Sequence, residues 1–131
     1  MYVDSHCHID FAIFDHDRNA LLARAYDQGV KQILIPGVEP AQWQRASQMS
    51  AEHGLFYSVG LHPWWIANNL EFLHDSLRVM RTHLLQPRCV AVGECGLDAF
   101  IDIPLALQIE YLNVQLALAS ELKLPDRKSV V

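Results

Sequence analysis

The stretch VKQILIPGVEPAQWQRASQMSAEHGLFYSVGLHP (residues 30–63) decides the fold class of this chain. It opens with a short β-rich run over 30–37 that a proline and a glycine close. A helical segment over 40–54 follows and stops at a glycine, and a second strand over 55–63 ends the stretch. Strands that are apolar on both faces and joined by a helix are typical of a parallel sheet with helical crossovers. The stretch therefore predicts a βαβ unit.

The same alternation of strands and helices extends toward both ends of the chain. Further strands are expected over 2–6 and 89–98, and further helices over 18–29, 69–85 and 104–124. The helix over 69–85 is predicted from apolar residues at helical spacing, Leu70, Leu73, Leu77, Met80 and Leu84. The order is βα four times, which indicates an α/β fold of parallel βα repeats.

The composition is that of a globular domain with a weakly acidic balance. The chain has 131 residues, of which 51% are hydrophobic and 19% charged. A net charge of -5 argues against a broad basic surface for nucleic acid, so phosphate chemistry would need a local positive charge such as a bound metal. Three cysteines without a CxxC pair do not favour a disulfide framework. With no signal peptide or long apolar run, we expect a cytoplasmic protein with no membrane partner.

The first predicted strand carries a convergent polar face. VDSHCHID (residues 3–10) places His6 and His8 two residues apart, and strand side chains alternate between faces, so Asp4 points with them. An isolated HxH is more often a pair of packing residues than a metal site. Asp4 is either a solvated charge or an acceptor that fixes a histidine tautomer, and the shared face favours the second interpretation.

Two other predicted strand ends carry polar side chains as well. GLHP contributes His62, and GECGLD contributes Glu94 and Asp98. In a parallel α/β fold the loops that follow the strands gather at one end, where a ligand binds. Imidazole and carboxylate groups suit zinc, manganese or a similar divalent ion, and a bridging carboxylate suits two ions. The sequence therefore predicts that His6, His8 and Glu94 ligate metal.

The remaining histidines, thiols and indoles receive less specific interpretations. Four histidines without partner spacing are read as surface residues, namely His16, His53, His74 and His83. Strand alternation turns Cys7 away from its histidine neighbours, so it is expected to be a small packed thiol. Trp64 and Trp65 offer either a stacking platform for bases or ordinary loop packing, and Trp43 is expected in the core.

The ordered set DSHCHID, GLHPWW, VAVGECGLD and QLALASELKLP resembles the TatD family of metal-dependent deoxyribonucleases, and within it the YjjV-like branch. The resemblance extends from about Val3 to Pro125, nearly the whole chain. It implies the first half of a TIM-like (β/α)₈ barrel of the metallo-dependent hydrolase type. It also implies hydrolysis of phosphodiester bonds, with DNA or another phosphodiester as the substrate.

The resemblance assigns roles to the residues that match the family's motifs. His6 and His8 would ligate the first of two divalent ions, which are zinc, manganese or magnesium. Glu94 would bridge both ions and act in catalysis, and His62 would help to hold the scissile phosphate. Asp98 would be structural or would support the ligands.

The resemblance ends where the chain reads LPDRKSVV, so Asp126 is the first residue outside it. Family members continue into a fifth strand and later strands that supply two further histidines and an aspartate to the metals. A full barrel needs at least about 200 residues. We therefore expect residues 1–131 to form a single truncated hydrolase domain with little nuclease activity of its own.

Other interpretations remain open at this point. A half barrel has open sheet edges, which favour self-association. The chain could be a catalytically inactive half-barrel fragment with at most weak metal binding. Amidohydrolases and PHP-type phosphoesterases also begin with a histidine pair, but the GLHP and GECGLD segments make both less favoured.

Overall fold

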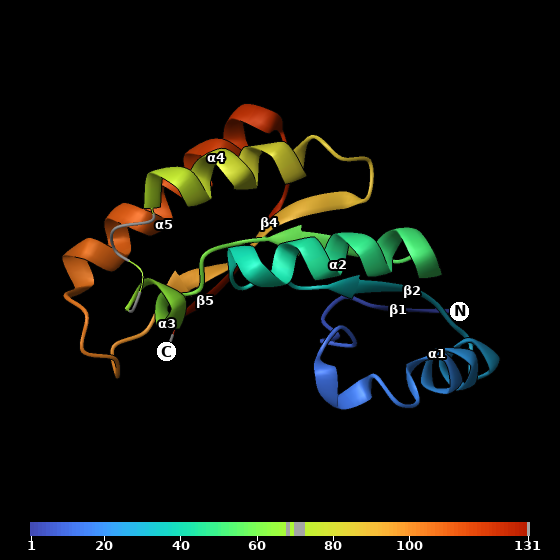
Figure 1. Cartoon of the computed structure of the whole chain (residues 1–131). Coiled ribbons are helices and arrows are strands. Elements are labelled where there is room, and N and C mark those ends of the chain that lie inside the picture. Colours follow the sequence, from blue (N-terminus) through green and yellow to red (C-terminus); the bar gives the residue numbers. More distant parts are fainter. Residues whose placement is uncertain (68, 70–72, 131) are drawn as a thin grey trace.

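The computed structural model contains one sheet of five parallel strands (Figure 1). It describes residues 1–67, 69 and 73–130. The strands lie side by side in chain order, namely β1 (Tyr2–Asp4), β2 (Val30–Ile35), β3 (Phe56–Val59), β4 (Cys89–Leu97) and β5 (Asp126–Val130). Each neighbouring pair is parallel, so every connection must cross from one end of the sheet to the other. The predicted parallel βα repeats are confirmed.

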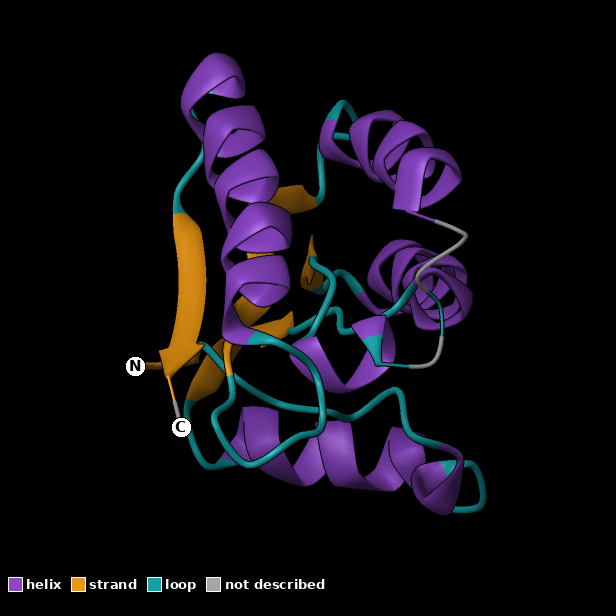
Figure 2. Cartoon of the chain, turned by 90° about the vertical axis from the view of Figure 1, so that its left-hand side faces the viewer, coloured by secondary structure: helices purple, strands orange, loops and turns teal. Residues whose placement is uncertain are grey.

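Helices make these crossovers and pack on the outer face of the curled sheet (Figure 2). They are η1 (Ala12–Phe14, a 3₁₀ helix), α1 (Arg18–Asp27), α2 (Pro40–His53), α3 (Pro63–Ile66), α4 (Leu73–Leu84) and α5 (Leu105–Leu122). The helix α2 ends at Gly54, whose φ of 72° is left-handed and favours glycine at a helix end. In the described part of the chain, no helix is both long and apolar enough to cross a membrane.

The helix predicted over 69–85 is observed as α4, and a short helix that was not predicted, α3, precedes it. The short α3 begins at Pro63, which suits the first turn of a helix because it lacks an amide hydrogen. His62 caps this helix, since its Nδ1 atom accepts a hydrogen bond from the Trp64 amide. The helix α4 then begins at Leu73, and the predicted apolar position at Leu70 lies outside the described residues.

The fifth strand was not predicted. Its residues 126–130 lie beyond the resemblance, yet they extend the sheet by pairing with β4, with Asp126 opposite Val92 and Lys128 opposite Cys95. Parallel pairing uses backbone groups, so it requires no apolar alternation in the added strand. The sheet is therefore one strand wider than the four βα units that the sequence predicts.

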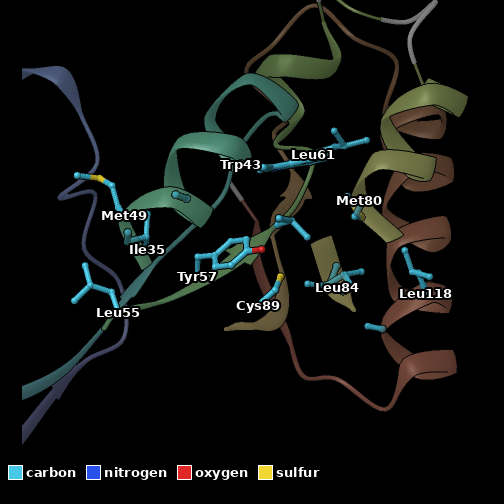
Figure 3. Close-up of a cluster of buried hydrophobic side chains, with 14 of the residues drawn as sticks. Ile35, Trp43, Met49, Leu55, Tyr57, Leu61, Met80, Leu84, Cys89 and Leu118 are labelled. Atoms are coloured by element: carbon cyan, nitrogen blue, oxygen red, sulfur yellow. The ribbon is translucent and has the colours of Figure 1, made fainter. Parts of the chain in front are cut away.

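The core lies between the sheet and its helices (Figure 3). Ile35 of β2 and Tyr57 of β3 face α2 and α4, and Trp43 of α2 is fully buried among them, as predicted. On the opposite, concave face of the sheet, Leu34 and Phe56 are only partly buried. Helices therefore bury one face of the sheet, whereas its concave face stays accessible to a partner or to further chain.

The four histidines predicted at the surface divide into two groups. His16 and His74 are exposed, but His53 and His83 are half-buried. The Nδ1 atom of His83 lies 3.1 Å from the Tyr57 hydroxyl, and burial lowers the pKa of His83. The prediction that His83 lies at the surface was wrong. The polar stretch RTH (residues 81–83) gives no indication that this side of α4 faces the strands.

The buried His83 makes a pH-dependent contribution to stability. Its folded-state pKa lies below the ordinary value of about 6.5, so between the two values the unfolded chain binds more protons. The free energy of unfolding should therefore fall as the pH falls through about 6.5. We expect His83→Gln to flatten this part of the urea-unfolding profile and His74→Gln to leave it unchanged. Parallel profiles for the wild type and His83→Gln would refute this assignment.

Candidate metal centre

Three side chains from distant parts of the sequence meet near the ends of β1 and β4. The Nε2 atom of His6 lies 3.6 Å from Oε2 of Glu94, and that of His8 lies 3.5 Å from the same oxygen. The potential ligand atoms of the three residues all lie within 4.8 Å of one another. Among the described residues, this is the one cluster of three or more such groups. The structure thus brings together the residues that the sequence grouped.

The spacing in this cluster fits a shared cation better than direct hydrogen bonds. A separation of 3.5 or 3.6 Å is too long for a good nitrogen–oxygen hydrogen bond. Two ligands held about 2.1 Å from a tetrahedral ion lie roughly 3.4 Å apart. The Nδ1 atoms of His6 and His8 are buried and have no hydrogen-bond partner among the described residues. The buried Nδ1 atoms are therefore not committed to hydrogen bonds within the described part of the chain.

The ligand set also leaves room for a substrate. Three protein ligands are typical of catalytic metal sites, where open positions remain for water or substrate. The side chains of His6 and His8 are 33% and 27% exposed, and that of Glu94 is 12% exposed. The three side chains are therefore partly shielded from water but still accessible.

The histidines reach this position in a way the sequence did not indicate. The strand β1 ends at Asp4, so His6 and His8 lie in the loop that follows it rather than on one face of a strand. Asp4 does not fix a histidine ring. Its Oδ1 atom accepts a hydrogen bond from the backbone amide of His6 at 3.1 Å, which shapes the turn into the loop. Cys7 packs against the core, as predicted.

The backbone of Glu94 is held by the loops that follow two neighbouring strands. Its amide donates a hydrogen bond of 2.6 Å to the carbonyl oxygen of Gly37. Gly60 lies so close to β4 that an added Cβ atom would be 2.6 Å from the Cα of Gly93 and closer still to the Glu94 carbonyl oxygen. The position of the Glu94 carboxylate therefore depends on residue 60 being a glycine, which has no side chain.

We expect Gly60→Ala to lower the stability of the fold and to weaken metal binding by His6, His8 and Glu94. Overpacking at this contact should lower the free energy of unfolding by about 1–3 kcal/mol. It should also weaken divalent-ion binding by about tenfold, because Glu94 must shift. The matched control is Gly54→Ala, where backbone strain costs about 1 kcal/mol but an added Cβ meets nothing within 4 Å. Equal metal affinities for the two variants, measured by calorimetry, would contradict this account.

His62 lies beside the cluster but does not belong to it. It lines a cleft of about 430 Å³ together with His8 and Glu94. Its Nδ1 atom accepts the Trp64 amide at 3.3 Å, while its Nε2 atom has no hydrogen-bond partner in the described part of the chain. Burial lowers the pKa of His62, and the nearby carboxylates of Glu94 and Asp98 oppose this shift. His62 is therefore placed to contact a ligand of the cleft.

Asp98 does not line this cleft itself, but it holds Trp64, which does. Its Oδ2 atom accepts the indole hydrogen of Trp64 at 2.6 Å, and its Oδ1 atom accepts the Phe100 amide at 2.8 Å. These two hydrogen bonds lower the pKa of Asp98. Asp98 is thus an ionised acceptor that orients Trp64, and it does not join the metal cluster.

Glutamines that fix the strand-end loops were missed in the sequence, and two of the three are buried. On α5, Gln115 pairs with both backbone groups of Leu61, and Gln108 pairs in the same way with Asp98. On α2, Gln42 bonds to the loop after β2. In the sequence, each of these glutamines is a polar residue on an otherwise apolar helix face. An analysis of hydrophobic periodicity alone assigns no role to such an isolated polar residue.

Comparison with known proteins gives a consistent set of relatives. The family model described as TatD related DNase matches residues 3–126. The uncharacterized metal-dependent hydrolase YjjV of Escherichia coli K12 is 33% identical over 126 residues. The 3'-5' ssDNA/RNA exonuclease TatD of Erwinia tasmaniensis is 34% identical over 115 residues. The crystal structure of YjjV, a TatD homologue, matches with a TM-score of 0.87 at 34% identity.

The extent of these matches defines which part of the fold is present. The match to YjjV covers 95% of this chain but 48% of that protein, and the match to the Erwinia protein covers 86% and 43%. The structural match covers 98% of this chain and 50% of the YjjV chain. The chain therefore spans about half the length of the curated relatives it matches, and its curled sheet is half of their barrel. The chain belongs to the TatD related DNase family.

Proposed function

We propose that this chain provides the first metal-binding half of a metal-dependent hydrolase that cleaves phosphodiester bonds of DNA. The observation that carries the proposal is the cluster of His6, His8 and Glu94, with two nitrogen–oxygen separations that suit a shared cation. Relatives named as metal-dependent hydrolases and as an exonuclease of single-stranded DNA and RNA support the same chemistry.

The chain's own residues divide the work in this proposal. His6, His8 and Glu94 would hold a divalent ion, namely zinc, manganese or magnesium, and Glu94 would also be a ligand of a second ion. His62 presents its Nε2 atom to the phosphate in the cleft. A bound cation supplies positive charge for the phosphate oxygens and makes water a better nucleophile. The chain has a net charge of -5, so this local charge is what attracts the substrate.

The proposal is tested most fully with a chimera. Residues 1–125 are joined to the remainder of E. coli YjjV, whose structure this chain matches over half its length. The chimera should cleave single-stranded DNA when manganese, magnesium or zinc is present, and Glu94→Gln in the same chimera should abolish cleavage. The 131-residue chain alone should cleave weakly, because residues 1–131 provide one cluster of three ligands in their described part.

One result would argue against this function, and another would show that the second half of the fold is not needed for it. A folded chimera that binds metal but leaves DNA intact would favour the alternative of an inactive half barrel with metal binding only. Robust cleavage by residues 1–131 alone, lost in Glu94→Gln, would show that one half of the fold is enough. Yeast RNA and a phosphodiester chromogenic substrate, tested in parallel, would define the substrate class.

We also infer a cytoplasmic location and a single folded unit for residues 1–131. All three cysteines are free thiols, and Cys89 and Cys95 are buried. Burial raises the pKa of Cys89 to about 12 and that of Cys95 to about 11, so neither is a reactive thiolate near neutral pH. Such thiols suit a reducing compartment.

A further inference from the structure

Trp64 is an exposed aromatic residue with a fixed orientation. It is 64% exposed on the short helix α3. Its indole Nε1 atom nevertheless donates a short hydrogen bond of 2.6 Å to Oδ2 of Asp98. A tryptophan whose polar atom is satisfied within the protein keeps its apolar ring faces for another partner. Exposure together with a defined ring position is what a stacking surface requires.

The group that holds Trp64 is itself rigid. Asp98 is 5% exposed, and its second carboxylate oxygen accepts the Phe100 amide. The buried Gln108 of α5 fixes its backbone twice, by accepting the Asp98 amide at 2.8 Å and donating to the Asp98 carbonyl oxygen at 2.9 Å. The helix α5 thus fixes the exposed indole indirectly, because Gln108 holds Asp98 and Asp98 holds Trp64.

This indole lies in the cleft that contains the metal cluster. Trp64 and Phe11 line that cleft together with His8 and Glu94. Phe11 stacks on the His8 ring with 4.6 Å between centroids, so one of its faces is already occupied. The Trp64 and His62 rings meet in a T-shaped contact with 5.3 Å between centroids and 78° between planes, and the 64% exposure of Trp64 shows that indole surface remains available. Trp64 is therefore the better platform for a planar ligand group.

We propose that Trp64 is a stacking subsite for an unpaired nucleobase of a nucleic-acid strand whose phosphate lies at the metal cluster. The inference rests on the proposed function and adds a base-binding position to it. Every base has a π-face that stacks on an aromatic side chain, so such a site accepts all four bases. A base within a duplex is stacked on both faces and must be unpaired first, which favours single strands.

The test measures binding without cleavage. Fluorescence anisotropy follows a labelled single-stranded oligonucleotide with phosphorothioate linkages binding to the full chain with manganese present. Trp64→Ala should weaken binding by about tenfold or more, and Trp64→Phe should retain part of the affinity. Phe100→Ala is the matched control, because Phe100 is 86% exposed nearby but does not line the cleft. It should bind like the wild type.

A second arm changes the ligand instead of the protein. The same strand with abasic sugars in place of its bases should bind the wild type about as weakly as the normal strand binds Trp64→Ala. Quenching of tryptophan fluorescence by the normal strand should also fall in Trp64→Ala, where only the half-buried Trp65 remains in the cleft and Trp43 is fully buried. Equal affinity of the wild type and Trp64→Ala, no effect of abasic sugars, or no detectable binding by the wild type would each overturn the subsite.

These results are separable from the metal assignment. If Glu94→Gln loses manganese binding while Trp64→Ala binds DNA normally, the stacking subsite fails and the proposed metal site stands. If Trp64→Ala loses DNA binding while Glu94→Gln still binds manganese like the wild type, the subsite stands and the metal assignment fails.

Discussion

Glu94→Gln is expected to weaken the binding of zinc or manganese to this chain by about a hundredfold or more. The substitution keeps the volume of the side chain but removes the anionic oxygen that both His6 and His8 face at about the distance of ligands around one ion. Changes to groups that merely support a ligand already cost about 10–100-fold in metal affinity. Loss of a ligating carboxylate should cost at least as much, because its charge and its coordination bond disappear together.

Glu39→Gln is the control for this experiment. Glu39 lines the same cleft, but it does not belong to the cluster of possible ligands. A general effect of negative charge in the cleft would weaken metal binding to a similar degree in both variants. Ligation by Glu94 predicts a large loss in Glu94→Gln and a change of only a few-fold in Glu39→Gln by isothermal titration calorimetry.

Trp43→Ala is expected to lower the free energy of unfolding by about 3–5 kcal/mol. Trp43 is fully buried between α2 and the strands (Figure 3), and its indole donates to the carbonyl oxygen of Gly60 at 3.3 Å. An added Cβ at Gly37 would lie 2.8 Å from the Trp43 ring, so the loop after β2 is packed directly on it. Domains of this kind are stable by only about 5–15 kcal/mol, so this one change removes a large share.

Trp43→Phe separates packing from the hydrogen bond. It keeps an aromatic ring in the core and should cost less than half as much as Trp43→Ala, including about 1 kcal/mol for the lost bond to Gly60. Urea unfolding gives both values from the midpoint and slope of the transition. A cost under about 1 kcal/mol for Trp43→Ala would show that Trp43 is not a central core residue.

The sequence was most informative where the chain repeats a simple pattern. Buried parallel strands appear in the sequence as short apolar runs. The helices between them appear as apolar residues at helical spacing that end at a glycine. The bounds of β2, α2 and β4 were therefore predicted close to the observed ones. His6, His8 and Glu94 were grouped as candidate metal ligands for a related reason. Polar side chains at the ends of apolar strands conflict with burial, and such conflicts are typical of functional sites.

The features that the sequence did not reveal depend on tertiary contacts. Strand β5 exists because β4 offers its backbone edge, and nothing in its polar residues indicates this. His6 and His8 were predicted to converge because they share one face of a strand. They do converge, but they lie in a loop whose turn is shaped by a hydrogen bond to Asp4. The burial of His83 depends on which side of α4 meets Tyr57, and local propensity carries no information about that.

The role of Trp64 shows a further limit of sequence reasoning. The pair at residues 64 and 65 was equally compatible with loop packing and with a stacking surface. The difference depends on a hydrogen bond to Asp98, 34 residues away in the chain, and on the glutamine that fixes Asp98. Only the fold shows that Trp65 packs against the core whereas Trp64 stays exposed.

The most direct test of the central claim is X-ray absorption spectroscopy of the zinc-loaded chain. The account predicts that His6 and His8 supply two imidazole nitrogens and Glu94 at least one carboxylate oxygen, at about 2.0–2.2 Å from the ion. In Glu94→Gln the zinc occupancy should fall sharply, and the zinc that is still bound should keep its imidazole signal but lose the carboxylate oxygen. A sulfur ligand at about 2.3 Å, as Cys7 would provide, or an unchanged spectrum with full zinc occupancy in Glu94→Gln, would contradict the account.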